Sequence, residues 1–353
     1  MSFRYARTVA VLFLATLVAL APQAVPAASP CEWNGIERVV AIGDVHGAYD
    51  RFVEILKIAG ILDNDLKWAA GRTHVVQLGD VLDRGDDSRK ALDLIRRLQR
   101  PAEAAGGMWH QLMGNHEVNR MLGDLRLVTP AEYAAFSNVD SESTRENYVK
   151  TQARSSADRA NLLKQMPLGF VEMRQAFGRD GEYGRWLRQL PVAIKIDGLL
   201  FVHGGISPAV APLGCDGIND QVRRELTSDL EKTRATPLAS LTARAEGPLW
   251  YRGLAEEPDT FAPQLTEILS KAHARAMVIG HTVTPTSRIT TRFDGRVVEI
   301  DTGMQPAYIP DGRAAALEIR GSDGTAIYVD RREPVELPRR EGSAAPQPLA
   351  VRR

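Results

Sequence analysis

The sequence predicts an α/β protein in which two β-sheets pack as a sandwich and are flanked by helices. Three observations support this class. Short apolar, β-branched runs bounded by turn residues recur along the chain. Helical patterns separate the first three runs, which is typical of parallel strands joined by helices. The later runs follow one another at short spacing, which favours antiparallel pairing, and two sheets accommodate both patterns.

The elements are expected in the following order. Strands are predicted at residues 38–42, 73–78, 108–113, 192–196, 199–202, 276–279, 297–300, 314–319 and 325–329. Helices are predicted at residues 49–58, 88–98, 129–136, 141–150, 181–190 and 261–275. The chain is therefore expected to open with a βαβαβ unit. Residues 118–189 are polar and helix-forming without a clear strand, so we predict a helical insertion between two core strands there.

Length and composition are typical of an ordinary globular chain, with room for one large domain or two average ones. The 353 residues include 44 lysines and arginines against 44 aspartates and glutamates. This balance gives no electrostatic reason to expect a nucleic-acid partner, because binding to a phosphate backbone normally requires a basic excess. We place the domain at residues 28–330. A flexible tail is expected at 331–353, where proline and arginine are frequent and apolar residues are few.

The first residues have the layout of a secretory signal. Arg4 and Arg7 precede an apolar stretch at 8–21, and small residues follow at 25–27. The apolar stretch is shorter than the ~20 residues that a membrane-spanning helix needs. We therefore expect a signal peptide at 1–27 that is cleaved, a periplasmic or secreted protein, and no stable membrane insertion. The sequence leaves the oligomeric state open.

The expected export affects how the two cysteines are interpreted, because an exported protein can retain a disulfide. In an oxidising compartment a bond between Cys31 and Cys215 can persist. We hypothesise that they pair and tie the mature N-terminus to a loop after the strand at 199–202. Two unrelated thiols are the alternative.

Five of the predicted strands end in loops rich in metal-ligand residue types. The loops are Gly-Asp-Val-His-Gly at 43–47, Gly-Asp-Val-Leu-Asp-Arg-Gly at 79–85, Gly-Asn-His-Glu at 114–117, His-Gly-Gly at 203–205 and Gly-His-Thr at 280–282. Ligands of open α/β sheets gather at the carboxyl ends of strands, so the loops are expected to converge. Carboxylate, imidazole and amide ligands suit Mn, Fe or Zn, and a carboxylate can bridge two such ions. The pattern predicts a two-metal hydrolase site.

Further side chains in these loops suit phosphate chemistry. Arg84 offers a planar fork of donors that matches phosphate oxygens. His116 is suited to protonate a leaving oxygen, and Asp83 is its natural carboxylate partner. Two other histidines, His74 and His110, lie in or at the start of apolar strands, and we interpret them as packed residues rather than ligands.

These motifs resemble those of the PPP-type phosphoprotein phosphatases within the calcineurin-like metallophosphoesterases, most closely the bacterial Shewanella-like branch. The resemblance covers about residues 39–301 and implies the calcineurin-like two-sheet β-sandwich for the domain at 28–330. It also implies a general acid, His116 paired with Asp83, and a phosphate clamp, Arg84. The metal ligands that it implies are Asp44 and His46 for the first ion, Asp80 as the bridge, and Asn115, His203 and His281 for the second ion.

The resemblance also bears on residues outside the metal ligands. Arg252, in Pro-Leu-Trp-Tyr-Arg-Gly at 248–253, matches the second phosphate-binding arginine of the family. Tyr308 is a candidate for the rim of the active site, and Glu117 is expected to support the metal ligands from outside. The export signal, the insertion and the lack of a toxin-binding cysteine loop distinguish the chain from the eukaryotic cytosolic members. Substrate recognition is therefore not carried over from them.

The resulting hypothesis is an exported, metal-dependent phosphoprotein phosphatase that hydrolyses phosphotyrosine, phosphoserine or phosphothreonine in protein or peptide substrates. Two metal ions are expected, Mn foremost with Fe or Zn as alternatives. A hydroxide held between them would attack phosphorus directly, without a phosphoenzyme. A dinucleoside tetraphosphatase, or another metallophosphoesterase or phosphodiesterase, is the alternative enzyme. A catalytically inactive binder of phosphorylated ligands is disfavoured, because no metal ligand is missing.

Overall fold

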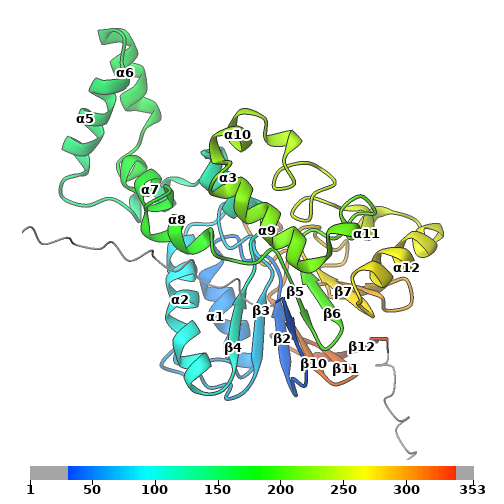
Figure 1. Ribbon diagram of the computed structural model, residues 1–353. Helices are drawn as coiled ribbons and strands as arrows, with labels where there is room; N and C mark the ends of the chain where they lie inside the picture. Colours follow the sequence, from blue (N-terminus) through cyan, green and yellow to red (C-terminus); the bar gives the residue numbers. More distant parts are fainter. Residues whose placement is uncertain (1–30, 339–353) are drawn as a thin grey trace, which may run out of the picture. The chain divides into compact units, whose positions relative to one another are not determined.

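The computed structural model describes residues 31–338, and the strands within them form two six-stranded sheets (Figure 1). In spatial order, the first sheet consists of β1 (Glu32–Trp33), β5 (Ala193–Ile196), β6 (Leu199–Val202), β7 (Ala276–Ile279), β9 (Val297–Glu299) and β8 (Thr290–Arg292). The second consists of β12 (Arg332–Val335), β11 (Asp323–Tyr328), β10 (Ala315–Arg320), β2 (Val39–Ile42), β3 (His74–Gln77) and β4 (Met108–Gln111). The predicted two-sheet α/β class is confirmed. The predicted signal peptide lies outside the described residues.

The chain opens with the predicted βαβαβ unit. Strands β2, β3 and β4 pair in parallel, and α1 (Tyr49–Ile58) and α2 (Ser88–Ala104) connect them. All four residues of β2 are buried. Val39 and Ala41 join an apolar cluster that contains residues of both sheets, whereas Val40 and Ile42 join the cluster that includes the helices. A strand covered on both faces is apolar throughout, which explains its uninterrupted Val-Val-Ala-Ile sequence.

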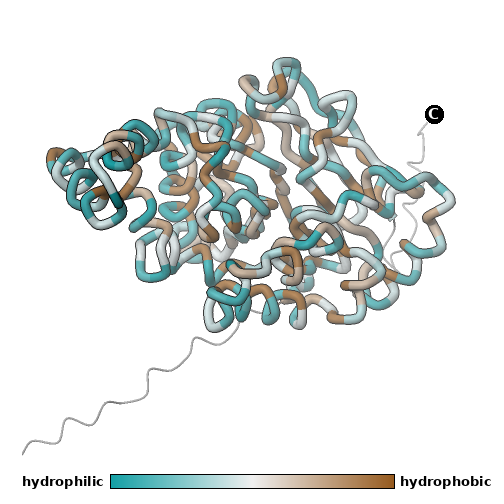
Figure 2. The backbone as a smooth tube through the Cα atoms, turned by 90° about the horizontal axis from the view of Figure 1, so that it is seen from above, coloured by the Kyte–Doolittle hydropathy of each residue, from teal (hydrophilic) through white to brown (hydrophobic). Residues whose placement is uncertain are grey.

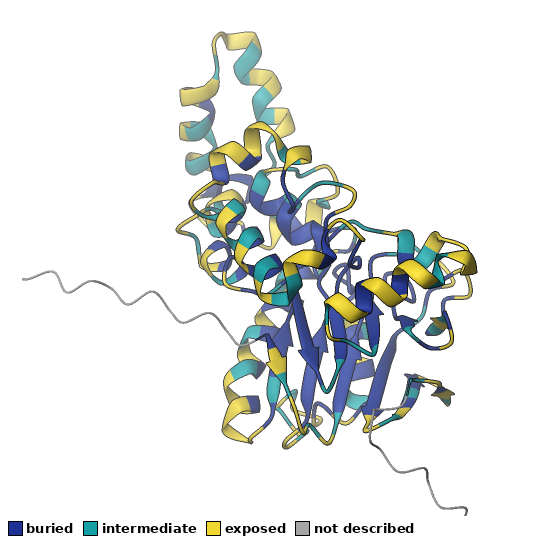
Figure 3. Cartoon of the chain, turned by 45° about the vertical axis from the view of Figure 1, so that its right-hand side comes forward, coloured by how far each residue is buried: buried dark blue, intermediate teal, exposed yellow. Residues whose placement is uncertain are grey.

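Burial follows this layering. Figure 2 shows hydrophobic strand segments running through the middle of the described chain. Figure 3 shows the same strands as buried, with exposed residues on the outward faces of the helices. Among the described residues, no helix combines the length and the apolar character needed to cross a bilayer.

Helices occupy the chain between β4 and β5, where the sequence predicts a helical insertion. They are α3 (Asn115–Leu122), α4 (Pro130–Ala134), α5 (Ser141–Gln152), α6 (Ser156–Gln165), α7 (Phe170–Phe177) and α8 (Glu182–Leu187). Helices α5 and α6 project beyond the others (Figure 1), and no residue of α6 is buried. Helices α3, α4 and α7 lie closer to the sheets and supply the side chains that reach the site described below.

The remaining helices lie between β6 and β7. They are α9 (Gly214–Leu226), α10 (Leu230–Ala235), α11 (Gly253–Glu256) and α12 (Ala262–Lys271), with short 3₁₀ turns at Ala211–Leu213, Pro237–Ala239 and Asp259–Phe261. Cys31 and Cys215 form the hypothesised disulfide, with 6.2 Å between their Cα atoms. Cys215 lies in the first turn of α9, not in a loop as predicted.

The tail boundary predicted at residue 331 is wrong. Strand β12 pairs with β11 in antiparallel register and adds an edge to the second sheet. Pro334 cannot donate a backbone hydrogen bond, but an edge strand tolerates this, and Val335 is buried. The proline and arginine content that suggested a flexible tail is therefore compatible with an edge strand. Residues 339–353 lie outside the described residues.

Candidate active site

Residues from four of the five ligand-rich loops line one cavity of about 300 Å³, and the loop at 203–205 lies behind them. Of the residues predicted for the site, those that line it are His46, Asp80, Asp83, Arg84, Asn115, His116, Arg252 and His281. Asp44 and His203 lie directly behind them: His203 Nε2 is 3.3 Å from Asp80 Oδ2, and His203 Nδ1 is 3.9 Å from Asp44 Oδ1. The structure thus brings together every residue that the sequence predicts for the site.

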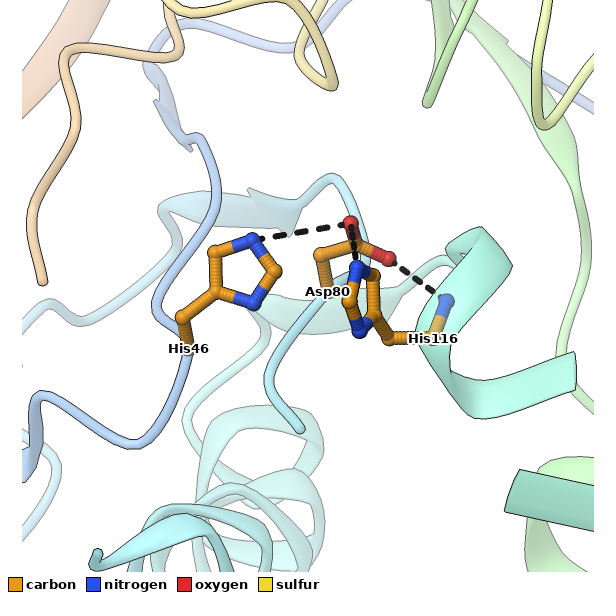
Figure 4. A group of neighbouring side chains, drawn as sticks. All are labelled: His46, Asp80 and His116. Atoms are coloured by element: carbon orange, nitrogen blue, oxygen red, sulfur yellow. Dashed lines mark hydrogen bonds and ion pairs between the residues drawn. The ribbon is translucent and has the colours of Figure 1, made fainter. Parts of the chain in front are cut away.

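Two groups of potential metal ligands share one carboxylate. Asp80 belongs to a group with His46 and His116 and to a second group with His203 and His281. The first group differs from the predicted ligand set, because it contains the predicted acid His116 and not Asp44. Within each group the ligand atoms lie within 4.8 Å of one another. Figure 4 shows the rings of His46 and His116 facing the Asp80 carboxylate, and the Nε2 atom of each lies 3.7 Å from Asp80 Oδ2. A carboxylate shared in this way is positioned to bridge two ions.

Buried atoms without partners point to the same conclusion. Within residues 31–338, Asp44 Oδ2 and His281 Nε2 are buried and have no hydrogen-bond partner. Asp44 Oδ2 lies 3.8 Å from His46 Nε2. Burying a polar atom without a partner is unfavourable, and a cation at each position would satisfy both atoms. The carboxylate, imidazole and amide donors suit first-row divalent ions, so the residues fit the expected pair of metals.

Backbone carbonyls orient two of the histidines. His46 Nδ1 lies 2.9 Å from Leu82 O, and His203 Nδ1 lies 3.0 Å from Leu78 O. A carbonyl only accepts hydrogen bonds, so Nδ1 carries the proton in each ring and Nε2 keeps a free electron pair for a metal. The Nε2 atom of His203 faces Asn115 Oδ1 at 2.9 Å. A cation bound by both atoms would resolve this contact between two acceptors.

The loops that carry these residues have an unusual backbone. Positive φ angles occur at His46 (47°), Asp80 (53°), Asp83 (69°), Arg84 (70°) and His281 (65°). Such angles are uncommon for residues other than glycine and tend to cluster at functional sites.

Close packing of the second and third loops explains the glycines that begin them. A side chain on Gly79 would collide with the backbone of Gly114. The carboxylate of Glu117 also joins these loops, because it accepts hydrogen bonds from the backbone N–H groups of Gly114 and Asp80 at 2.8 Å and of Val81 at 2.9 Å. Glu117 therefore supports the ligands without belonging to either ligand group.

His116 and Asp83 form a close pair beside Asp80. His116 Nδ1 lies 2.7 Å from Asp83 Oδ2, and the His116 backbone N–H donates to Asp80 Oδ1 at 2.9 Å. Burial acts to lower the pKa of His116, but the carboxylates of Asp80 and Asp83 outweigh it and raise that pKa above its ordinary value. Burial acts to raise the pKa of Asp83, but the contacts with His116 and Arg120 hold it below its ordinary value. The pair is therefore suited to keep a proton on His116.

His46 and His281 favour the neutral form that binds metals. Burial lowers the pKa of His46 to about 4 and that of His281 to about 2. Burial and the nearby carboxylate of Asp301 raise the pKa of Asp44 well above its ordinary value, and burial raises the pKa of Asp301 to about 6. Bound cations would favour the charged form of both carboxylates.

Three arginines line the cavity, and two of them, Arg84 and Arg252, were predicted for the site. The guanidinium carbon of Arg84 lies 3.6 Å from the ring centroid of Tyr308, which is at the rim and 40% exposed. Arg252 donates from Nη1 to His281 O at 3.1 Å and to Thr282 Oγ1 at 3.0 Å. Their positions on the cavity wall are compatible with a phosphate group held above the ligand groups.

Several residues at the site were not predicted from the sequence, among them Asp301 and Arg120. Asp301 lines the cavity directly after β9, so the strand-end signal that identified the other loops applied to it as well. Arg120 contacts Asp83 from α3, four residues after His116. Helical spacing places the side chains of His116 and Arg120 on one face of α3. Nothing in the sequence indicates that Arg120 is buried.

Comparisons with known proteins agree with this geometry. The family described as calcineurin-like phosphoesterase matches residues 37–285. Shewanella-like protein phosphatase 2 of Arabidopsis thaliana is 31% identical, over 82% of this chain and 77% of that protein. Shewanella-like protein phosphatase 1 of Plasmodium berghei is 25% identical, over 77% of this chain and 68% of that protein. The crystal structure of a cold-active protein-tyrosine phosphatase from a psychrophilic Shewanella species has a TM-score of 0.69 at 31% identity, covering 87% of this chain and 83% of that one.

Proposed function

Because this chain belongs to the calcineurin-like phosphoesterase family and, within it, to the Shewanella-like protein phosphatases, we propose that it is an exported phosphatase whose substrates include phosphotyrosine in proteins. Phosphoserine and phosphothreonine are the further substrates to be tested. The enzyme class itself, a metal-dependent phosphoprotein phosphatase, follows from family membership. The observation that carries the proposal is Asp80, which two ligand groups share beneath a cavity that also presents Arg84 and Arg252.

The residues of the cavity divide the chemistry among them. When bound, the two metal ions would supply the nucleophile for direct attack on phosphorus. Arg84 and Arg252 orient the phosphate through its oxygens. The guanidinium of Arg84 lies over the ring of Tyr308, which restricts its position. As the P–O bond breaks, His116 gives a proton from Nε2 to the leaving oxygen, while its Nδ1 remains bonded to Asp83.

The cavity walls favour an aromatic leaving group. Trp250, Leu127 and Tyr308 line the cavity together with the charged residues. Apolar and aromatic side chains near a phosphate site can pack against the ring of phosphotyrosine. A solved structure similar to this one is described as a protein-tyrosine phosphatase, which supports the same substrate.

A substrate and metal panel tests the proposal. Metal-stripped enzyme receives Mn, Fe, Zn or Mg and is assayed on phosphotyrosine, phosphoserine and phosphothreonine peptides. We expect hydrolysis of the phosphotyrosine peptide, with Mn the most effective metal. No hydrolysis of any peptide with any metal overturns the proposal. Preference for bis(p-nitrophenyl) phosphate over p-nitrophenyl phosphate would favour a phosphodiesterase instead.

The disulfide supports the exported location. Cys31 and Cys215 are bonded, and disulfides persist chiefly in oxidising compartments. Together with the signal-like pattern at residues 1–27, this favours a periplasmic or secreted enzyme. Cell fractionation with N-terminal sequencing of the mature protein tests this location. A cytoplasmic protein that retains its first residues contradicts it.

A further inference from the structure

Arg120 and Glu132 form a buried ion pair next to the predicted general acid. The two oxygens of Asp83 have different partners: Oδ2 lies 2.7 Å from His116 Nδ1, and Oδ1 accepts from Arg120 Nη2. With both oxygens engaged, the Asp83 carboxylate cannot turn without breaking a charged contact. The orientation of the His116 ring therefore depends on where Arg120 lies.

Helices of the insertion hold Arg120 in place. Glu132, on α4, accepts from the same Nη2 atom at 2.9 Å, and the side chains of both residues are at most 2% exposed. On α7, Met173 Sδ lies 3.3 Å from Arg120 Nη1, and the ring centroid of Phe177 lies 5.1 Å from the guanidinium carbon. The guanidinium is thus fixed by an opposite charge from one helix and by packing from another.

Burial makes this contact specific. A guanidinium removed from water is stable only when it is paired with opposite charge. The position of the Arg120 guanidinium is therefore set by its carboxylate partners, Asp83 and Glu132. Asp83 is shared between His116 and Arg120, and Glu132 supplies a second negative charge to Arg120. Without Glu132, only Asp83 would bind the guanidinium, and the geometry of the Asp83–His116 contact would change with it.

We propose that Arg120 and Glu132 are a positioning pair that aligns His116 for proton donation to the leaving oxygen, and that α4 and α7 of the insertion take part in catalysis through this pair. Neither residue touches the substrate. The inference rests on the proposed function, because it assigns a role within that reaction.

The test compares two substrates that differ in their need for an acid. Phenyl phosphate has a poor leaving group that requires protonation, whereas dinitrophenyl phosphate releases a stable anion that does not. For Glu132→Gln and for Arg120→Gln we expect the ratio of the kcat values, phenyl over dinitrophenyl, to fall about 10-fold, part of the effect of losing a general acid. This ratio does not depend on the fraction of enzyme that is folded, so a partial folding defect does not alter it.

Control variants separate positioning from general damage. Glu146→Gln makes the same change in an exposed pair of the insertion, where Glu146 lies 3.6 Å from Arg159, and should leave the ratio within twofold of wild type. In a His116→Asn background, which already lacks the acid, Arg120→Gln should not change the ratio further. A ratio within twofold of wild type for both Glu132→Gln and Arg120→Gln overturns the proposal, and so does a further fall of the ratio in the double variant.

The outcomes also distinguish this inference from the proposed function. If wild-type enzyme hydrolyses neither aryl phosphate with any added metal, the proposed phosphatase function fails and the inference fails with it. If wild type hydrolyses both and the variants keep its ratio, the function stands and only the positioning role is rejected.

Discussion

His116 is the residue on which the proposed chemistry depends most directly, because it combines a close carboxylate partner with access to the cavity. Replacing it by asparagine removes the proton donor but retains a polar side chain of similar size. We predict that His116→Asn lowers kcat on phenyl phosphate by about 10² to 10⁴, the usual range for a general acid. Because His116 is not among the six predicted ligands, which are Asp44, His46, Asp80, Asn115, His203 and His281, metal content measured by elemental analysis should remain near wild type. Near-normal turnover in this variant would remove the acid role.

Asp80 is the residue on which metal binding depends, since both ligand groups contain it. Replacing a residue that only supports the metal ligands typically lowers metal affinity about 10- to 100-fold. We predict a larger loss of metal affinity for Asp80→Asn, because Asp80 is itself a predicted ligand of both ions. Titration of the metal-stripped protein with Mn measures this. Asp124→Asn is the control, because Asp124 lines the cavity but belongs to neither ligand group. Equal Mn affinity in both variants would contradict a bridging role for Asp80.

The predicted site residues lie close together in the structure. Residues in compact motifs at strand ends could be predicted, because the sheet itself brings strand ends together. Arg120 could not, since its role depends on Asp83 and Glu132, which approach it through tertiary packing. Asp301 carried the strand-end signal but lacked a motif of ligand types around it.

Secondary structure elements were predictable where they are apolar and buried on both faces. The central strands, such as β2 and β7, are continuous apolar runs and were placed within one residue of their observed bounds. Three strands at sheet edges, β1, β8 and β12, were missed, since none has an apolar run. All three are strands because a neighbouring strand supplies hydrogen-bond partners, which is information that the local sequence does not contain.

The disulfide between Cys31 and Cys215 fastens the start of the described chain to helix α9. It joins residues 184 apart in sequence and restricts the unfolded chain. We predict that Cys215→Ser lowers the free energy of unfolding by about 2 to 5 kcal/mol, measured by urea unfolding without reductant. Dithiothreitol should destabilise wild type by a similar amount and leave the variant unchanged. Equal stability of wild type with and without dithiothreitol would contradict a stabilising bond.

A pair of buried histidines makes the stability of the whole molecule sensitive to acid. His110 Nε2 lies 3.0 Å from His74 Nδ1, and burial together with the charge of His74 lowers the pKa of His110 to about 3. In the unfolded chain the pKa is about 6.5, so between these values the unfolded state binds more protons than the folded state. The free energy of unfolding should therefore fall as pH drops below about 6.5, by up to about 1.4 kcal/mol per pH unit for this group.

Urea unfolding of wild type and His110→Asn between pH 7 and pH 5 measures this effect. The variant should show a shallower loss of stability on acidification, whatever its stability at neutral pH. His273→Asn is the matched control, because His273 is exposed and has a φ of 49° that asparagine tolerates, and it should keep the wild-type slope. Identical slopes for all three proteins would rule out the histidine pair as the cause.

The sequence by itself determined the α/β class, the convergence of five loops and the residue types of a two-metal phosphatase site, because strand periodicity and strand-end position are local properties that fix where side chains emerge. Only the tertiary structure decided that β12 completes an edge, that Asp301 joins the cavity, and that Glu132 contacts Arg120, which in turn contacts Asp83. These features arise from contacts between segments far apart in the chain, and their stability comes from burial and charge pairing that exist only after folding.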